Sequence, residues 1–308
     1  MREPMREPMR VRRVIDDERE VNVGAWDWEQ FVAHQSGRLE LTQQELMSFV
    51  RNDARVAAAQ AATDEDARQN ARQLAVVVEG FLSEAECDAM VAQVEGEGLL
   101  SETKSETLQR LLANCNFEGD DEKLDQKLRF AEDVRGRMWS RLFELDGAGE
   151  EGRALLGELR TAPEWSARDH HVRHAGTDME VRLSAMSDYI RLMKYSAPRE
   201  ATATGDFDTD PRNAHHDGRN QRAEGDSFLT ALLYLNSEGD EGLQGGGTLF
   251  LDTDGATVAR VSPKKGALLI FDHHLYHKGE SVAQGVKYVL RSDLLYRACD
   301  ARTGEALK

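Results

Sequence analysis

Residues 227–236 read Ser-Phe-Leu-Thr-Ala-Leu-Leu-Tyr-Leu-Asn, an apolar segment with the length of a β-strand. Similar short segments, rich in Val, Leu, Ile, Phe and Tyr, follow one another between residues 180 and 298 and are separated by Gly and Asp turns. The sequence before about residue 160 favours helices instead. Helices first and strands afterwards predict an α+β fold, in which helices support an antiparallel barrel or sandwich.

The helical part contains two N-terminal capping signals. Thr42 and Glu45 have the spacing of a capping box, and a helix is expected over residues 40–72. An apolar strand is expected at residues 74–78. Ser83 and Glu86 form a second capping box, which predicts a helix directly after that strand. Two or three further helices are expected between residues 102 and 160.

The chain begins with a tandem repeat, Met-Arg-Glu-Pro twice and then Met-Arg. With Pro4 and Pro8 and no periodic apolar face, this segment is expected to be disordered. Its arginines resemble an organelle transit peptide, but Glu3 and Glu7 argue against one. We assign residues 1–72 to an N-terminal extension with a disordered start and a helix. Residues 73–308 form the main domain, with its core at about 186–298.

The composition limits the classes of partner. The chain has 308 residues, of which 40% are hydrophobic, enough for a sizeable core. Its formal net charge is −17, from 56 acidic and 39 basic residues. So acidic a protein repels a phosphate backbone, and no nucleic-acid partner is expected. A protein, a peptide or a small molecule is a more suitable partner, and charge alone does not choose among these.

The cysteines and the hydropathy pattern limit the compartment. Cys87, Cys115 and Cys299 are too few and too widely spaced for a disulfide framework, and no Cys pair has zinc-binding spacing. No apolar run reaches the roughly 20 residues of a membrane span. The N-terminus also lacks the apolar stretch of a secretory signal. We therefore expect a soluble, intracellular protein of the cytoplasm or nucleus with no membrane partner, and leave its oligomeric state open.

Eight of the nine histidines fall in three clusters. The middle cluster reads His215-His216-Asp217-Gly218. Residues i and i+2 of a strand project from the same face, so His215 and Asp217 can approach one ion together. Joined by a distant histidine, this pair forms the facial triad of non-haem iron oxygenases. The alternative is a solvated turn ahead of Gly218.

The third cluster supplies a candidate for that distant histidine. In oxygenases that use 2-oxoglutarate, the co-substrate chelates iron through its keto-acid end, and its far carboxylate requires a cation. Lys287 lies ten residues after His277 on an apolar strand, whereas neither residue ten positions after His273 or His274 is basic. The spacing therefore favours His277. A lysine in an apolar strand is costly to bury unless it meets an anion, and the alternative is an edge-strand lysine facing water.

At this point six blocks of sequence, in order, carry a resemblance to a known family. The chain resembles the prolyl 4-hydroxylase-like Fe(II)- and 2-oxoglutarate-dependent oxygenases. The blocks are IRLMKY (190–195), HHDG (215–218), SFLTALLYLN (227–236), GGGTLF (245–250), PKKGALLIF (263–271) and HKG (277–279) continuing to GVKY (285–288) and RSD (291–293). Weaker similarity reaches back to residues 74–97, while residues 1 to about 72 lie outside it.

The resemblance implies a double-stranded β-helix, a distorted jelly roll with iron at its mouth. It implies that Fe(II) is bound by His215, Asp217 and His277 and that 2-oxoglutarate and O2 are co-substrates, with L-ascorbate as a supporting reductant. The reaction implied is hydroxylation of a C–H bond, with peptidyl proline as the leading substrate and succinate and CO2 as products. Other protein residues and small molecules remain alternatives. The residues implied to contact 2-oxoglutarate are Lys287, Tyr234, Tyr195 and, ranked lower, Thr230.

The sequence departs from the family pattern before the first histidine. The loop between Tyr195 and His215 is about ten residues longer than usual, and the aromatic residue that the family often has shortly before the first histidine is missing. Such a loop can act as a lid or substrate selector, so the departure concerns the substrate and leaves the iron ligands in place. Two rival functions are a nucleic-acid demethylase, which the net charge and the position of Lys287 oppose, and a catalytically silent jelly roll that binds partners.

Three further features of the sequence lead to separate expectations. Arg291 lies four residues after Lys287, so both should face the same side of the barrel. Arg291 is expected to meet either a substrate carboxylate or the iron-bound end of 2-oxoglutarate, or else an acid such as Asp217 or Asp293. His170 and His174 have helical metal spacing but no third ligand nearby and are expected at the surface. Residues 252–255 resemble the start of a calcium loop, and a hairpin turn is expected instead.

Overall fold

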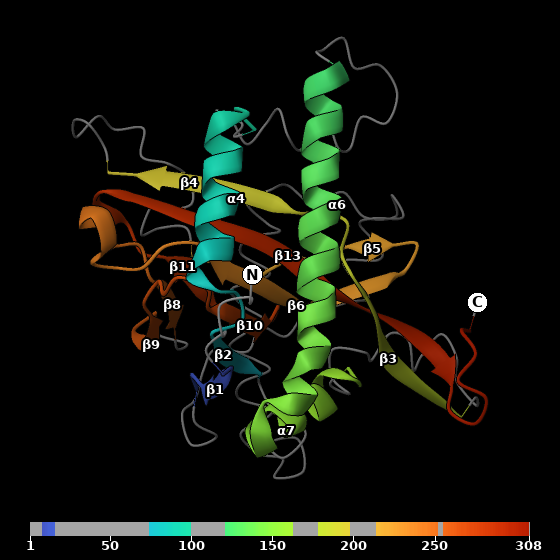
Figure 1. Cartoon of the computed structure of the whole chain (residues 1–308). Helices are drawn as coiled ribbons and strands as arrows, with labels where there is room; N and C mark the ends of the chain where they lie inside the picture. The colour runs from blue at the N-terminus through green and yellow to red at the C-terminus, as the bar shows by residue number, and fades with distance from the viewer. Residues whose placement is uncertain are drawn as a thin grey trace, which may run out of the picture.

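The computed structural model describes residues 8–15, 74–99, 121–162, 178–197, 214–251 and 255–307. Its helices are α4 (Glu84–Gly96), α6 (Asp121–Phe143) and α7 (Gly149–Leu159), with the short 3-10 helices η1 (Glu144–Gly147) and η2 (Asp240–Gly242). The strands from β3 onward all lie between residues 179 and 300. Figure 1 shows α4 and α6 lying across the face of a long antiparallel sheet. The prediction of an α+β fold is confirmed.

The larger sheet is built around its longest strand, β13. Its strand order is β1 (Arg10–Arg13), β2 (Ala75–Glu79), β10 (Leu268–Asp272), β6 (Gly225–Tyr234), β13 (Val286–Asp300) and β3 (Met179–Met186). Two more strands join it, β4 (Arg191–Ser196) beside the first half of β13 and β5 (Gln221–Arg222) beside β6. Every pairing is antiparallel. Because β13 pairs on both edges, its backbone N–H and C=O groups are bonded within the sheet.

The smaller sheets are made by the strands between β6 and β13. One has the order β11 (His277–Gly279), β8 (Thr248–Leu251) and β9 (Thr257–Val261), and the other pairs β12 (Val282–Gln284) with β7 (Gln244–Gly245). Together with the larger sheet they form a double-stranded β-helix, the jelly-roll core that the resemblance implied.

Strict alternation along the strands divides the core in two. On β6, Leu229, Ala231 and Leu233 pack toward the helices, whereas Leu232 and Tyr234 belong to the cluster inside the jelly roll. The period-two pattern of a pleated strand produces this division. The same alternation on β13 sends Leu290 and Leu294 to the helix side. Lys287, Val289, Arg291 and Asp293 share the opposite parity, that of the jelly-roll interior.

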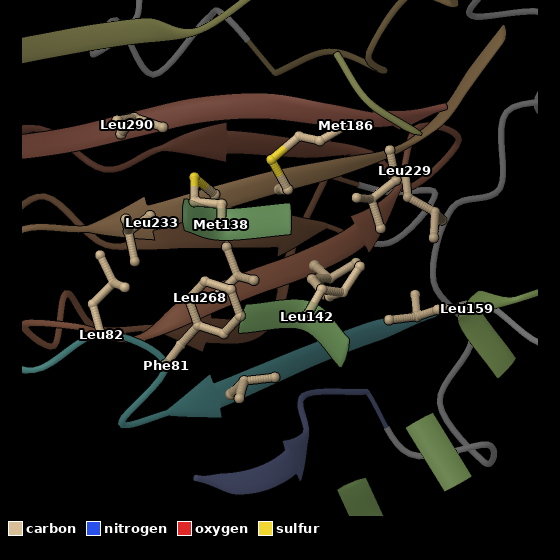
Figure 2. Packing of buried hydrophobic residues seen from close by; sticks show 14 of the residues in the cluster. Phe81, Leu82, Met138, Leu142, Leu159, Met186, Leu229, Leu233, Leu268 and Leu290 are labelled. Atoms are coloured by element: carbon tan, nitrogen blue, oxygen red, sulfur yellow. The ribbon is translucent and has the colours of Figure 1, made fainter. Parts of the chain in front are cut away.

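The helices cover the outer face of the larger sheet. Met138 and Leu142 of α6 are fully buried, and Figure 2 shows them beside Leu233 and Leu268 of the sheet. Truncating either of these to alanine would cost about 2–5 kcal/mol of unfolding free energy, because a cavity would remain. The predicted capping box at α4 is present, with Glu86 N–H donating to Ser83 Oγ and Ser83 N–H donating to Glu86 Oε2.

Strand β1 is a feature that the sequence did not predict. The sequence placed residues 1–72 outside the main domain with a disordered start, yet Arg10–Arg13 pairs with β2 at the edge of the larger sheet. Arg13 also forms an ion pair with Glu158 of α7. The strand has four residues, three of them arginines, so its local pattern contains almost no apolar alternation from which a strand could be predicted.

Several predictions fall outside the described residues. These are the helix at 40–72, His170 and His174, the long loop at 198–213, the turn at 252–254, and Cys115. Within the described part of the chain, Cys87 and Cys299 are buried free thiols. None of the helices described there is both long and apolar enough to cross a membrane.

Candidate active site

Three potential metal ligands lie close together in the folded chain. His215, Asp217 and His277 each present one ligand atom, and these atoms lie within 4.8 Å of one another. Nε2 of His215 is 3.7 Å from Asp217 Oδ1, and Nε2 of His277 is 3.7 Å from Asp217 Oδ2. The side chain of His215 is 47% exposed, while those of Asp217 and His277 are buried. The cluster is therefore open to solvent on the His215 side.

Backbone hydrogen bonds hold these three residues together. His215 and His277 form a two-bond antiparallel bridge, with N–H to O distances of 2.9 and 3.0 Å. Asp217 N–H donates to the carbonyl of His273 at 2.9 Å. The segment at 215–217 is thus attached to the segment at 273–277 like a short extra strand. His215 and Asp217 project to the same side, as the two-residue period predicts.

The ring of His277 is oriented by a neighbouring carbonyl. Its Nδ1 lies 2.8 Å from the carbonyl oxygen of Leu275 and donates its proton there, which leaves the lone pair of Nε2 facing the cluster. Burial lowers the pKa of His277 to about 3, outweighing the opposing effect of Asp217. The imidazole is therefore neutral at pH 7, the form that binds a metal ion.

The neighbouring histidines point elsewhere. Nδ1 of His216 donates to the carbonyl of His274 at 2.7 Å, and its ring lies 5.0 Å from that of Tyr276. Burial lowers the pKa of His216 to about 4. Nε2 of His273 lies 3.5 Å from Asp293 Oδ1, away from the three ligand atoms. Of His273, His274 and His277, it is therefore His277 whose ring nitrogen joins the ligand atoms of His215 and Asp217.

Both oxygens of Asp217 receive hydrogen-bond or ion-pair donors from the larger sheet. Thr230 Oγ1 of β6 donates to Oδ2 at 2.5 Å, and Nη2 of Arg291 of β13 lies 2.7 Å from Oδ1. Burial alone would raise the pKa of Asp217, but the charge of Arg291, followed by His277, holds it well below its usual value. The carboxylate is ionised and its plane is fixed by donors from two strands. Arg291 also lies 3.7 Å from Asp293.

Lys287 occupies a second, more deeply buried location on the same face of β13. Only 5% of the residue is exposed, and its Nζ lies 5.5 Å from the ring centre of Tyr195 and 5.6 Å from that of Tyr234. These distances are within the range of cation–π attraction. Lys287 is therefore buried within the jelly roll and does not face water from an edge strand.

The two tyrosines differ in how their hydroxyl groups are bound. Tyr234 is fully buried, and its Oη lies 2.7 Å from Thr248 Oγ1, where either hydroxyl can donate. Burial raises its pKa, so it is neutral. The Tyr195 hydroxyl donates to Sδ of Met193 at 3.0 Å. Thr230, in contrast, lies against Asp217, at the metal end and not beside Tyr234.

Comparison with known proteins gives a family for this arrangement. Residues 208–292 match the model of the 2OG-Fe(II) oxygenase superfamily. The matched segment includes His215, Asp217, His277 and Lys287. This segment of the chain matches a 2OG-Fe(II) oxygenase domain. Fe(II) and 2-oxoglutarate are the cofactor and co-substrate that the description of that superfamily names.

Solved structures similar to the oxygenase are prolyl hydroxylases at low sequence identity. A viral collagen prolyl hydroxylase from Paramecium Bursaria Chlorella virus-1 is 15% identical, with 72% of this chain and 89% of that chain covered and a TM-score of 0.32. A prolyl 4-hydroxylase from Phytophthora capsici is 18% identical, covering 75% and 60%, with a TM-score of 0.34. One from Pseudomonas putida is 15% identical, covering 56% and 79%, with a TM-score of 0.25. No curated protein sequence matches the chain.

The donor set of the oxygenase fits Fe(II). Two imidazole nitrogens and one ionised carboxylate are the ligand types of a facial triad, and such a triad leaves coordination positions for other molecules. The ligand types, the tautomer of His277 and the low pKa of Asp217 all agree with a divalent cation at this location. A set of three protein ligands agrees less well with a structural zinc site, in which four protein ligands fill the coordination sphere.

Sequence reasoning missed several residues around the oxygenase site. Asn220 Nδ2 donates to Asp293 Oδ2 at 3.0 Å, and Arg219 forms an ion pair with Asp226 directly after the His-x-Asp segment. Thr248, the partner of Tyr234, follows the glycine run. Asp293, which Asn220 contacts, was already named from the sequence as a possible partner of Arg291. No local pattern singles out Asn220 or Thr248.

Proposed function

We propose that this oxygenase hydroxylates an unactivated C–H bond of a peptidyl proline, converting 2-oxoglutarate and O2 to succinate and CO2. His215, Asp217 and His277 would hold Fe(II), which supplies the activation of O2 for the reaction when bound. The observation that carries the proposal is the meeting of these three ligand types within 4.8 Å of one another. Residues 198–213 precede His215 in sequence and are the candidate substrate-selecting loop.

Lys287 would pair with the distal carboxylate of 2-oxoglutarate. Its burial inside the jelly roll supports this role, because a buried ammonium group is stabilised by a matching anion. Tyr234 can donate to the same carboxylate if Thr248 supplies the proton of their shared hydrogen bond. Tyr195 would line the co-substrate site from β4. Thr230 would act at the other end, by holding Asp217.

The peptidyl-proline substrate rests on the ordered motifs shared with prolyl 4-hydroxylases. A peptide is also compatible with the partly exposed His215, which leaves the metal cluster accessible from solvent. L-ascorbate would support turnover by returning iron to its ferrous state. A different amino-acid side chain is the nearest alternative, because the long 198–213 loop departs from the family pattern where the substrate would be selected.

Succinate formation tests the reaction class. Purified protein is incubated with Fe(II), ascorbate and 2-oxoglutarate, with and without proline-rich peptides, and succinate and peptide mass are measured. We expect slow succinate release without peptide and faster release, with one oxygen atom added to the peptide, when the right sequence is present. The Asp217→Ala variant is the control and should release none. Equal succinate from both proteins would refute the proposed reaction, whereas succinate without any modified proline would refute only the substrate.

A further inference from the structure

Gly246, the middle one of the three consecutive glycines Gly245 to Gly247, packs against the stem of Lys287. The φ angles of Gly245 and Gly246 are +77° and +76°, a conformation that favours glycine. A Cβ added to Gly246 would lie 3.0 Å from Cδ of Lys287 and 3.3 Å from Cγ2 of Val282. The glycine turn therefore packs against the methylene chain of the lysine without room for a side chain. Any movement of the turn changes the space available to Lys287.

Each backbone N–H of this turn is held by a defined acceptor. Gly245 N–H donates to Glu238 Oε1 at 3.1 Å, and Gly247 N–H donates to Glu280 Oε2 at 2.9 Å. Gly246 N–H donates to the carbonyl of Ser281 at 3.1 Å. Two of the three acceptors are carboxylates on loops far apart in sequence. The position of the turn thus depends on where Glu238 and Glu280 are held.

Arg260 of β9 binds both of these carboxylates. Its Nη2 lies 2.8 Å from Glu238 Oε1 and 2.6 Å from Glu280 Oε2, and its Nη1 and Nε make further hydrogen bonds to the two acids. Hydrogen bonds from Arg260 lower the pKa of Glu238, so that this acid is ionised at neutral pH. The planar fork of an arginine can join two carboxylates in this way, which a lysine cannot reproduce.

We propose that Arg260, Glu238 and Glu280 form a clamp that positions Lys287 through the glycine turn and so sets the selectivity for a 2-oxo acid with a distal carboxylate. The proposal rests on the proposed function, in which Lys287 meets that carboxylate. The three clamp residues act as positioning residues, because the glycine turn transmits their placement to the lysine stem.

The clamp can be tested by comparing two 2-oxo acids that differ only at the far end. In 2-oxovalerate a methyl group replaces the distal carboxylate of 2-oxoglutarate. The affinity of each is measured by calorimetry on the Mn(II)-loaded protein, which binds but does not turn over. We expect Arg260→Met to lower the affinity for 2-oxoglutarate on the order of tenfold. The weaker binding of 2-oxovalerate should stay unchanged. Arg260→Lys should fall between wild type and Arg260→Met.

Matched variants separate positioning from general damage. Arg302→Met removes an arginine that is ion-paired to Asp178 at the exposed end of the chain, and it should leave both affinities unchanged. In a Lys287→Met background, adding Arg260→Met should cause no further loss. Gly246→Ala leaves the clamp intact but intrudes on Lys287, and it should also weaken 2-oxoglutarate selectively. It keeps the test available if Arg260→Met fails to fold, which the thermal midpoint would show.

Two results for Arg260→Met would overturn the clamp alone. A third result, for the wild-type protein, would overturn the co-substrate role of Lys287 as well. If Arg260→Met binds 2-oxoglutarate as wild type does, or weakens both acids equally, the clamp does not position Lys287. If the wild-type protein itself does not prefer 2-oxoglutarate over 2-oxovalerate, the proposed co-substrate role of Lys287 fails and the clamp with it.

Discussion

The two cations on the inner face of strand β13 lie in opposite surroundings. Arg291 is partly exposed and lies against the carboxylates of Asp217 and Asp293. Lys287 is buried between the rings of Tyr195 and Tyr234 and under a glycine turn. The same strand thus places one positive charge at the metal end of the site and another at the proposed co-substrate end. Arg291 and Lys287 carry the same charge and lie on the same face of β13, but they differ in function because their surroundings decide what each one binds.

The largest effects are expected at the metal end. His277→Ala or His215→Ala should weaken binding of Fe(II), or of Mn(II) in its place, by more than about 100-fold, since a coordinate bond is lost. His216→Ala and His274→Ala serve as matched controls, because His216 Nδ1 faces the carbonyl of His274 and not the cluster. Calorimetric titration of the metal measures all four. Equal losses across the four variants would show that the ligand set is wrongly assigned.

The next effect is expected at the other cation. Lys287→Ala should weaken 2-oxoglutarate binding by about 3–5 kcal/mol, because the distal carboxylate would be left without its partner in a partly dry site. Metal affinity should stay near that of the wild type. Lys194→Ala is the control, since that lysine pairs with Glu95 on the outer surface. Normal 2-oxoglutarate binding by Lys287→Ala would show that Lys287 does not mark a co-substrate end separate from the metal end at Arg291.

A smaller effect is expected from the arginine. Arg291→Gln should lower metal affinity about 10- to 100-fold, because Asp217 loses the donor that fixes its Oδ1 and keeps its pKa low. Metal titration and succinate release are measured together. If metal affinity is unchanged while coupled hydroxylation is lost and uncoupled succinate remains, Arg291 serves the substrate and not Asp217.

The smallest effect should come from a single hydroxyl group. Tyr234→Phe should weaken 2-oxoglutarate by about 1–3 kcal/mol, through loss of one hydrogen bond to a charged group. Tyr288→Phe removes a hydroxyl that donates to Glu95 outside the jelly roll, and it should leave the affinity unchanged. Similar behaviour of the two variants in a 2-oxoglutarate titration would mean that Tyr234 only packs the core.

The sequence predicted which residues face inward better than it predicted what they contact. Alternation and spacing were sufficient to select His215, Asp217, His277 and Lys287 as one set. Alternation also grouped Thr230 with Tyr234, but four residues of strand separate them by about 13 Å, and Thr230 lies at Asp217 instead. Whether a residue is at an odd or even position determines the face of the strand on which its side chain lies, but not its place along the strand.

Contacts between distant segments could not be predicted. Arg260 joins loops that lie 22 and 20 residues away from it in sequence, and no periodic pattern connects them. Whether Arg291 meets Asp217 or a ligand was left open, because the answer depends on how closely the His-x-Asp segment approaches β13. Such pairings require the register of the folded sheets, which local sequence patterns do not contain.

Strand β1 has a practical consequence for how this protein can be shortened. A fragment beginning at residue 73, the boundary that the sequence suggested, would lack the strand that covers one edge of β2. That edge would present unpaired backbone groups of the apolar segment Ala75–Val78 to solvent. Exposed apolar edges pair readily with edges of other molecules, so the fragment would be prone to self-association and aggregation. Its solubility would then report on the missing N-terminal strand and not on the quality of the catalytic core.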